Sequence, residues 1–186
     1  CSSDLVLYIG WDNKVQIAAS GAGDDKVVAT ISGGGGTLTK MGGGNYIAKV
    51  NSVTDEAIIN VTVDGKQMGS QSFRVRTIPD PVATVGGVMS NDNIPAGQFK
   101  AQSGVGAFIK DFPLKLQYTV VSFTLTADDE NGDILEAPCT GNTWSPKALS
   151  IIKGLTAGRT VTIDNIRAQG PDGRVRKIPG LVYYIK

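Results

Sequence analysis

Residues 57–76 read AIINVTVDGKQMGSQSFRVR, and this stretch decides the class of fold. It opens with a mostly β-branched segment, which is typical of a β-strand. Asp64-Gly65 follows directly and favours a two-residue type I′ hairpin turn, because both central positions of that turn need a positive φ. In the returning segment apolar and basic side chains alternate, in the order Phe73, Arg74, Val75, Arg76. The stretch therefore predicts a β-hairpin whose return strand has an apolar and a basic face.

The residues before this hairpin repeat the pattern of short β-branched or alternating segments separated by glycine-rich turns. Further strands are expected over residues 5–9, 14–19, 26–31, 37–40 and 46–50. About seven strands at this spacing indicate an immunoglobulin-like β-sandwich over residues 1–78. The paired cysteines and central tryptophan of antibody domains are missing, so the likeness is to the architecture and not to that family.

The boundary of this first domain is expected at Ile78-Pro79-Asp80-Pro81. Two prolines so close together cannot continue a central strand, and each one biases the preceding residue toward an extended conformation. The segment should therefore be a stiff connector that holds two domains at a defined angle. The second domain would span residues 79–186.

The second domain is expected to be β-rich with one short α-helix near residues 145–155. Ser145-Pro146 is typical of a helix start, with serine as the N-cap and proline at the first helical position. Residues 94–101 are compatible with a further helical turn. A strand is expected over residues 115–127, where the apolar phase shifts at Val120-Val121, and another over residues 159–169, with a bulge at Asp164-Asn165.

The chain contains no histidine, so the usual general base and the commonest metal ligand are both missing. A Ser-His-Asp or Cys-His site is impossible within these residues, while a Ser-Lys or paired-carboxylate enzyme remains open. The acidic clusters, at residues 24–25 and 128–133, fall in expected loops and lack the donor pattern of a calcium loop. The glycine runs, at residues 33–36 and 42–44, precede strand-like residues and not the helix of a phosphate loop. We therefore expect no catalytic, cofactor-binding or metal site.

Charge and hydropathy give no support for a nucleic-acid-binding protein or for a membrane-spanning segment within these residues. With 18 basic and 17 acidic residues scattered along the chain, the net charge is +1, and no basic stripe suggests a nucleic-acid partner. No apolar run approaches the roughly 20 residues that span a bilayer, and no signal peptide is visible.

Two kinds of side chain are candidates for contact with a partner. Arg74, Arg76, Arg174 and Arg176 form two pairs, which are either exposed residues that keep a strand soluble or a polar protein–protein interface. Trp11 and Trp144 either stack on a glycan or pack over the end of a strand or helix.

The two cysteines, Cys1 and Cys139, could pair in an oxidising compartment, but they are too few for a structural zinc site without histidine. Cys1 followed by Ser2-Ser3-Asp4 would also suit the lipidated first residue of a bacterial lipoprotein. An arbitrary start of the chain at Cys1 is the alternative.

Several segments together resemble the C-terminal periplasmic domains of the GldM/PorM family of gliding motility and type IX secretion. GGGGTLTK at residues 33–40 and FRVRTIPDP at residues 73–81 are similar to the third domain and its junction with the fourth. GPDGRVRK at residues 170–177 resembles the fourth domain.

The resemblance implies a non-catalytic structural and interaction module without cofactors. It would be a homodimer in the periplasm, anchored in the inner membrane through an upstream helix that is not in this chain. The implied partners are GldL/PorL, through absent upstream segments, and the GldK/GldN or PorK/PorN ring at the outer membrane, to which force or conformation would pass. If Cys1 is instead a lipidated N-terminus, the alternative is a lipid-anchored lipoprotein of the periplasm or surface that binds glycans or proteins.

Overall fold

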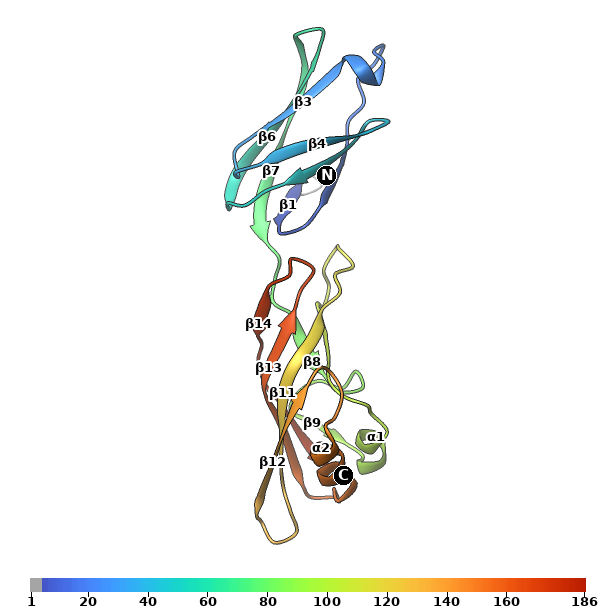
Figure 1. The fold of residues 1–186 in the computed structure, drawn as a ribbon, viewed down its shortest axis with the longest axis vertical. Helices are drawn as coiled ribbons and strands as arrows, with labels where there is room; N and C mark the ends of the chain where they lie inside the picture. The colour runs from blue at the N-terminus through green and yellow to red at the C-terminus, as the bar shows by residue number, and fades with distance from the viewer. Residues whose placement is uncertain (1–4) are drawn as a thin grey trace. The chain divides into compact units, whose positions relative to one another are not determined.

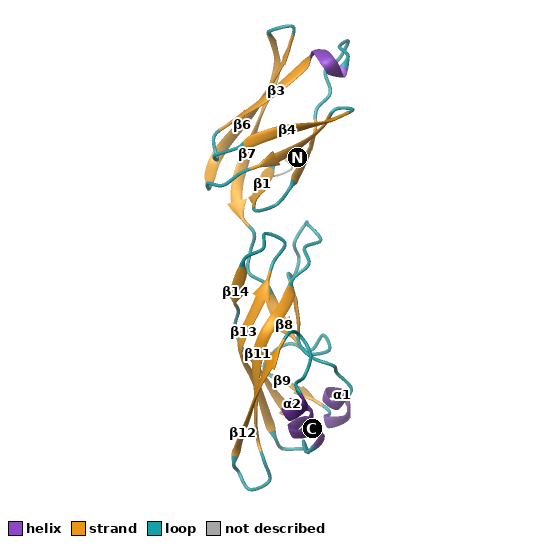
Figure 2. Ribbon diagram, in the orientation of Figure 1, coloured by secondary structure: helices purple, strands orange, loops and turns teal. Residues whose placement is uncertain are grey.

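The computed structural model describes residues 5–186, and the chain divides into two compact units, residues 1–78 and residues 79–186 (Figure 1). Strands predominate in both units, and the helices are few and short (Figure 2). The mainly β fold class predicted from the sequence is thereby confirmed. Each unit has its own hydrophobic core.

Two sheets make up the first unit, with strand orders β1-β7-β6-β3 and β2-β5-β4. The strands are β1 (Val6–Ile9), β2 (Asn13–Gln16), β3 (Val27–Ser32), β4 (Thr37–Gly42), β5 (Asn45–Lys49), β6 (Thr54–Val63) and β7 (Lys66–Thr77). A single turn of 3-10 helix, η1 (Asp24–Lys26), precedes β3. Leu7 and Val75 of the first sheet are buried in one cluster with Ala48 of the second, so the two sheets pack face to face as a β-sandwich.

The Asp64-Gly65 hairpin joins β6 to β7 as predicted, with φ angles of 50° and 76° at its two central residues. Strand β2, in contrast, ends at Gln16 and does not continue to residue 19. The reason lies in its partner, because β5 begins at Asn45, directly opposite Gln16. Only the Ile17 N–H continues the pairing, by donating to the Gly44 carbonyl.

The second unit is built on a sheet with strand order β12-β11-β13-β15-β9, in which β14 also pairs with β13. These strands are β9 (Asp92–Ile94), β11 (Thr119–Asp128), β12 (Ile134–Thr140), β13 (Thr160–Gln169), β14 (Val175–Lys177) and β15 (Leu181–Ile185). A two-stranded sheet pairs β8 (Val82–Thr84) with β10 (Gly106–Phe108). Helices α1 (Ala96–Lys100) and α2 (Pro146–Lys153) place Phe99 and Ile152 in the same core as the sheet.

Three local predictions in this unit are confirmed. The Ser145 side chain accepts a hydrogen bond from the Ala148 N–H and caps α2, which begins at Pro146. The register between β11 and β13 shifts between Val120 and Ser122, which leaves an extra residue on β11. The register shifts a second time between Ser122 and Thr124, and here the extra residue is on β13. Asn165 lies in this bulge, with a φ of 52°. The expected strand over residues 115–127 begins only at Thr119.

Candidate functional site

Arg176 is held inside the second unit by a network of charged and aromatic groups. Its side chain is only 11% exposed, and its Nε lies 3.1 Å from Asp80 Oδ1. Nη1 and Nη2 donate to the two carboxylate oxygens of Asp172, at 3.0 Å and 2.5 Å. The guanidinium also lies over the Tyr118 ring, 5.8 Å from its centroid. Arg176 is therefore committed to intramolecular contacts.

The same network ties the segment that opens the second unit to its sheet. The Tyr118 hydroxyl donates to the Pro79 carbonyl at 3.0 Å, next to the Arg176–Asp80 ion pair. Burial alone would raise the pKa of Asp172, but hydrogen bonds from the Arg176 side chain and the Arg174 N–H outweigh it and lower that pKa. Burial raises the pKa of the Tyr118 hydroxyl further above neutral pH, so this hydroxyl is protonated and can donate.

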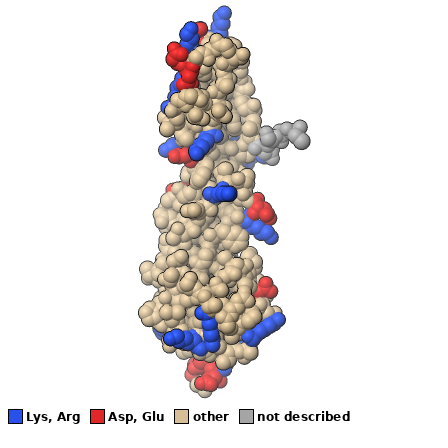
Figure 3. Space-filling view, turned by 90° about the vertical axis from the view of Figure 1, so that its right-hand side faces the viewer, with Lys and Arg blue, Asp and Glu red and all other residues tan. Residues whose placement is uncertain are grey.

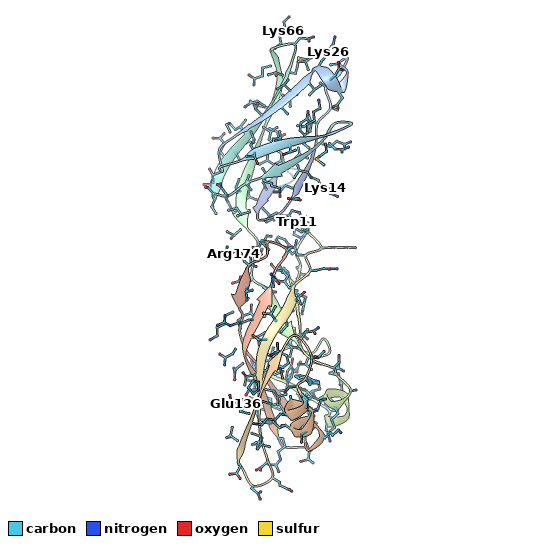
Figure 4. The ribbon with its side chains drawn as sticks, in the orientation of Figure 1. Trp11, Lys14, Lys26, Lys66, Glu136 and Arg174 are labelled. Atoms are coloured by element: carbon cyan, nitrogen blue, oxygen red, sulfur yellow. The ribbon has the colours of Figure 1, made fainter. Side chains whose placement is uncertain are left out.

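Of the other three arginines of the candidate interface, Arg74, Arg76 and Arg174, the last two are more exposed than Arg176. Arg76 is 35% exposed on β7, where it donates to the Thr54 carbonyl at 2.9 Å and pairs with Asp55 at 2.7 Å. Arg74 lies on the same face of β7 and is half-buried. Arg174 is exposed at the turn before β14 (Figure 4). An interface through Arg74, Arg76 and Arg174 stays a prediction, whereas the Arg176 guanidinium has little surface to offer.

The two tryptophans differ in environment. Trp144 is 6% exposed, stacks on Phe99 at 5.8 Å and meets the edge of Phe123 at 5.5 Å. Its Nε1–H donates to the Gln102 carbonyl at 2.7 Å. Trp144 is thus a core residue packed at the start of α2, and it presents no ring face to a glycan. Trp11 is half-buried in the loop after β1.

Of the two cysteines, Cys139 is buried with a free thiol, and Cys1 lies outside the described residues. The Cys139 sulfur packs against the start of α2, where the Ser145 N–H points at it from 3.4 Å. The lipidation expected at Cys1 and a disulfide between the two cysteines both stay predictions.

Two residues of the acidic cluster at 128–133 make contacts that hold the fold. Asp128 accepts from the Thr160 N–H at 3.1 Å and pairs with Arg159 at 3.5 Å; the bond from Thr160 is the main cause of its lowered pKa. Asp129 accepts from two backbone N–H groups of its own hairpin. Within residues 5–186 no group of three or more acidic or thiol side chains converges on a point where a metal ion could bind. No helix in that range has the length and apolarity to cross a bilayer.

Charged residues form no continuous patch on the visible face in Figure 3, where blue and red groups are scattered between wide uncharged areas. This distribution agrees with the balanced composition and does not resemble the basic stripe that a phosphate backbone requires.

A groove of about 750 Å³ lies in the first unit. One wall is formed by β7 and β1, and the other by β2 and the residues after it. The lining is mainly apolar; it includes Leu5, Val15, Ile17, Ile59, Val61, Met68 and Phe73. Sequence reasoning missed this groove.

Comparison with known proteins assigns both units. The family model described as "GldM third domain" matches residues 2–76, and the one described as "GldM C-terminal domain" matches residues 79–186. The chain belongs to the GldM family. Membership of the GldM family supports involvement in the gliding and type IX secretion machinery and points to a non-catalytic structural module. No curated protein sequence matches the chain significantly.

Two solved structures are distantly similar to the GldM-family chain. Fibronectin(III)-like modules of Clostridium thermocellum CbhA share 14% identity over 100% of this chain and 92% of theirs, with a TM-score of 0.28. The Yersinia pseudotuberculosis adhesin InvE shares 15% identity over 97% of this chain and 57% of its own, with a TM-score of 0.24. Similarities this weak say nothing about function.

Proposed function

We propose that the chain is a non-catalytic periplasmic module of the type IX secretion and gliding machinery. It would pass force or conformation to the ring proteins at the outer membrane. The observation that carries the proposal is the match to two GldM domains in order, over residues 2–76 and 79–186. In this proposal the protein acts as a homodimer, with GldK/GldN- or PorK/PorN-type proteins as ring partners. It would reach GldL/PorL and the inner membrane through segments upstream of this chain.

The strand order of the first unit suits a domain that carries tension. Its first strand, β1, pairs in parallel with its last strand, β7, from Val6 opposite Arg74 to Ile9 opposite Thr77. If the chain is pulled at the start of β1 and the end of β7, the two neighbouring strands slide in opposite directions. All hydrogen bonds of the pair are then loaded together, in shear, and do not break one at a time.

The segment that receives this tension in the second unit is anchored as well. Pro79 accepts from Tyr118, and Asp80 pairs with the buried Arg176, so a pull on this segment acts directly on the sheet. Two prolines, at positions 79 and 81, restrict its backbone further.

Pulling on single molecules tests the mechanical part of the proposal. With handles at both ends of the chain, we expect the first unit to unfold at a higher force than a variant with Leu7→Pro. Proline at this position removes a backbone donor from the short β1. Glu130→Pro, in the exposed hairpin tip between β11 and β12, is the control. Equal unfolding forces for all three proteins would contradict shear loading of β1 and β7.

The proposed role in secretion is tested in cells that produce the full-length gene product. Photo-crosslinkers on the exposed surface of residues 80–186 should capture outer-membrane ring proteins, and removal of those residues should abolish secretion. The truncated protein must be present at normal levels for the comparison to count. Unchanged secretion at normal levels would refute the role in the secretion machinery.

A further inference from the structure

The hairpin between β11 and β12 ends in a tip where asparagine is followed by glycine (Figure 1). Asn131 is the one asparagine of the sequence that glycine follows directly. Both residues are exposed, and Gly132 has a positive φ of 82°. Because glycine has no Cβ, the Asn131 side chain can approach the Gly132 backbone nitrogen without a steric barrier. The tip therefore combines the two groups that spontaneous deamidation needs.

In this reaction the Gly132 backbone nitrogen attacks Cγ of Asn131. The proton of Gly132 passes to the side-chain nitrogen of Asn131, which leaves as ammonia. The succinimide ring that remains takes up one water molecule and opens at either of its two carbonyls. The products are aspartate and isoaspartate, and water is the only co-reactant. Because the nitrogen attacks after losing its proton, the rate rises with pH and falls when a hydrogen bond holds the N–H.

Asp129 holds the backbone around the attacking nitrogen. The Gly132 N–H donates to the Asp129 carbonyl at 3.0 Å. The carboxylate oxygen Oδ1 of Asp129 accepts from the Asn131 N–H and from the Asp133 N–H, both at 2.9 Å. The Asp129 N–H closes the hairpin by donating to the Asp133 carbonyl at 2.9 Å. The nucleophile is thus hydrogen-bonded, and one carboxylate fixes the residues on both sides of it.

Local charge opposes the reaction as well. Four acidic residues lie within three positions of Asn131, at 128, 129, 130 and 133. Negative charge that develops on the reacting atoms is disfavoured beside these carboxylates. Deamidation would add a fifth carboxylate to the tip. Its isoaspartate product would also lengthen the backbone by one methylene group, directly before the Gly132 N–H that donates to Asp129.

We propose that Asn131-Gly132 is a site of deamidation by water, and that the Asp129 side chain slows the reaction by holding the turn. Loss of the two side-chain bonds of Asp129 frees the turn and releases the Gly132 nitrogen for attack. The modification lowers the net charge of the sequence, which is +1, by one unit and places the new charge at an exposed hairpin tip. It requires neither a ring protein nor force and lies outside the proposed function.

Mass spectrometry of the chain, incubated at mildly alkaline pH and then digested, tests the proposal. The peptide that contains Asn131 should gain about one dalton, and isoaspartate in it can be detected by enzymatic methylation. In the folded wild type this gain should be slower than in the same chain unfolded in urea. Asp129→Ala should raise the rate in the folded chain about fivefold, the change that one net hydrogen bond corresponds to.

Asp133→Ala is the matched control, because it removes the same charge while the Asp133 side chain takes part in none of these bonds. Asp129→Asn keeps an acceptor oxygen and should react like Asp133→Ala, more slowly than Asp129→Ala. Asn131→Gln should remove the product at this position. Equal rates for Asp129→Ala and Asp133→Ala would overturn the role of the Asp129 bonds. If Asp129→Ala fails to fold, the wild type decides: a gain as fast in the folded chain as in urea, or no gain in urea, overturns the proposal.

Discussion

Replacing Arg176 by methionine tests whether the network around the opening of the second unit stabilises the fold. Methionine has a similar length but no charge and no donors, so the substitution leaves Asp172 without its guanidinium partner. The Asp172 side chain is only 5% exposed, and it loses both hydrogen bonds from Arg176. Its one remaining donor among these contacts is the Arg174 N–H, at 3.1 Å from Oδ1.

The expected loss can be estimated from these contacts. Removing one partner of a buried ion pair costs about 3–5 kcal/mol, because the other charge stays buried. The surviving bond from the Arg174 N–H places Asp172 at the lower end of this range. The Asp80 pair adds little, because Asp80 is 67% exposed. We therefore expect Arg176→Met to lower the free energy of unfolding of the second unit by about 3 kcal/mol at neutral pH.

Urea denaturation followed by Trp144 fluorescence measures this loss. Trp144 lies in the core of the second unit, and a Trp11→Phe background makes it the only tryptophan. Arg174→Met is the matched control, because this exposed arginine binds Asp172 through its backbone; its cost should stay within about 0.5 kcal/mol. Equal stability of the two variants would refute the reasoning.

The difference between wild type and Arg176→Met should also depend on pH. The pKa of Asp172 is lowered in the fold, since the hydrogen bonds from Arg176 and Arg174 outweigh its burial. A carboxyl with a lowered pKa stabilises the fold above its unfolded value of about 3.9. That contribution is lost as the pH falls through the lower, folded value. The gap between the two proteins should therefore be widest near neutral pH and should narrow below about pH 4.

Three further substitutions probe other parts of the fold. Asn13→Ala removes a buried amide that donates to the Ala48 carbonyl at 3.1 Å; it should cost the first unit about 2–3 kcal/mol, measured by amide exchange in β5. Gly34→Ala should cost the same unit about 2 kcal/mol, since φ is +63° and a Cβ would lie 2.9 Å from Val75, as a thermal melt can show. Ser145→Ala removes the cap of α2 and should cost the second unit about 1 kcal/mol by Trp144 fluorescence.

Local features of the fold could be predicted because local chemistry determines them. Asp64-Gly65 tolerates the positive φ that a type I′ turn demands, and Ser145-Pro146 combines a cap with a residue suited to the first helical turn. The apolar side chains change phase at Val120-Val121. This shift predicts a bulge, because one extra residue lets the apolar side chains on both sides of it face the same side of the sheet. The structure has that bulge and a second one in the facing strand, near Asn165.

The role of Arg176 could not be predicted from alternation. In the alternating pattern of a strand, Arg176 occupies the same kind of position as Arg76, and each has another arginine two residues before it. The two arginines differ in the acidic residues that they contact. Arg176 pairs with Asp172, four residues earlier across a tight turn, and with Asp80, at the start of the second unit. Asp55, the partner of Arg76, is 93% exposed. Burial of a charge depends on such distant partners, which period-2 patterns do not contain.

The groove in the first unit could not be predicted from the sequence either, because its lining comes from four strands, β1, β2, β6 and β7, that are distant from one another along the chain. Strand β7 is predicted by its own residues. Which residues of the other three strands lie beside it in the groove depends on the paths of those strands, and no single segment of the sequence contains that information.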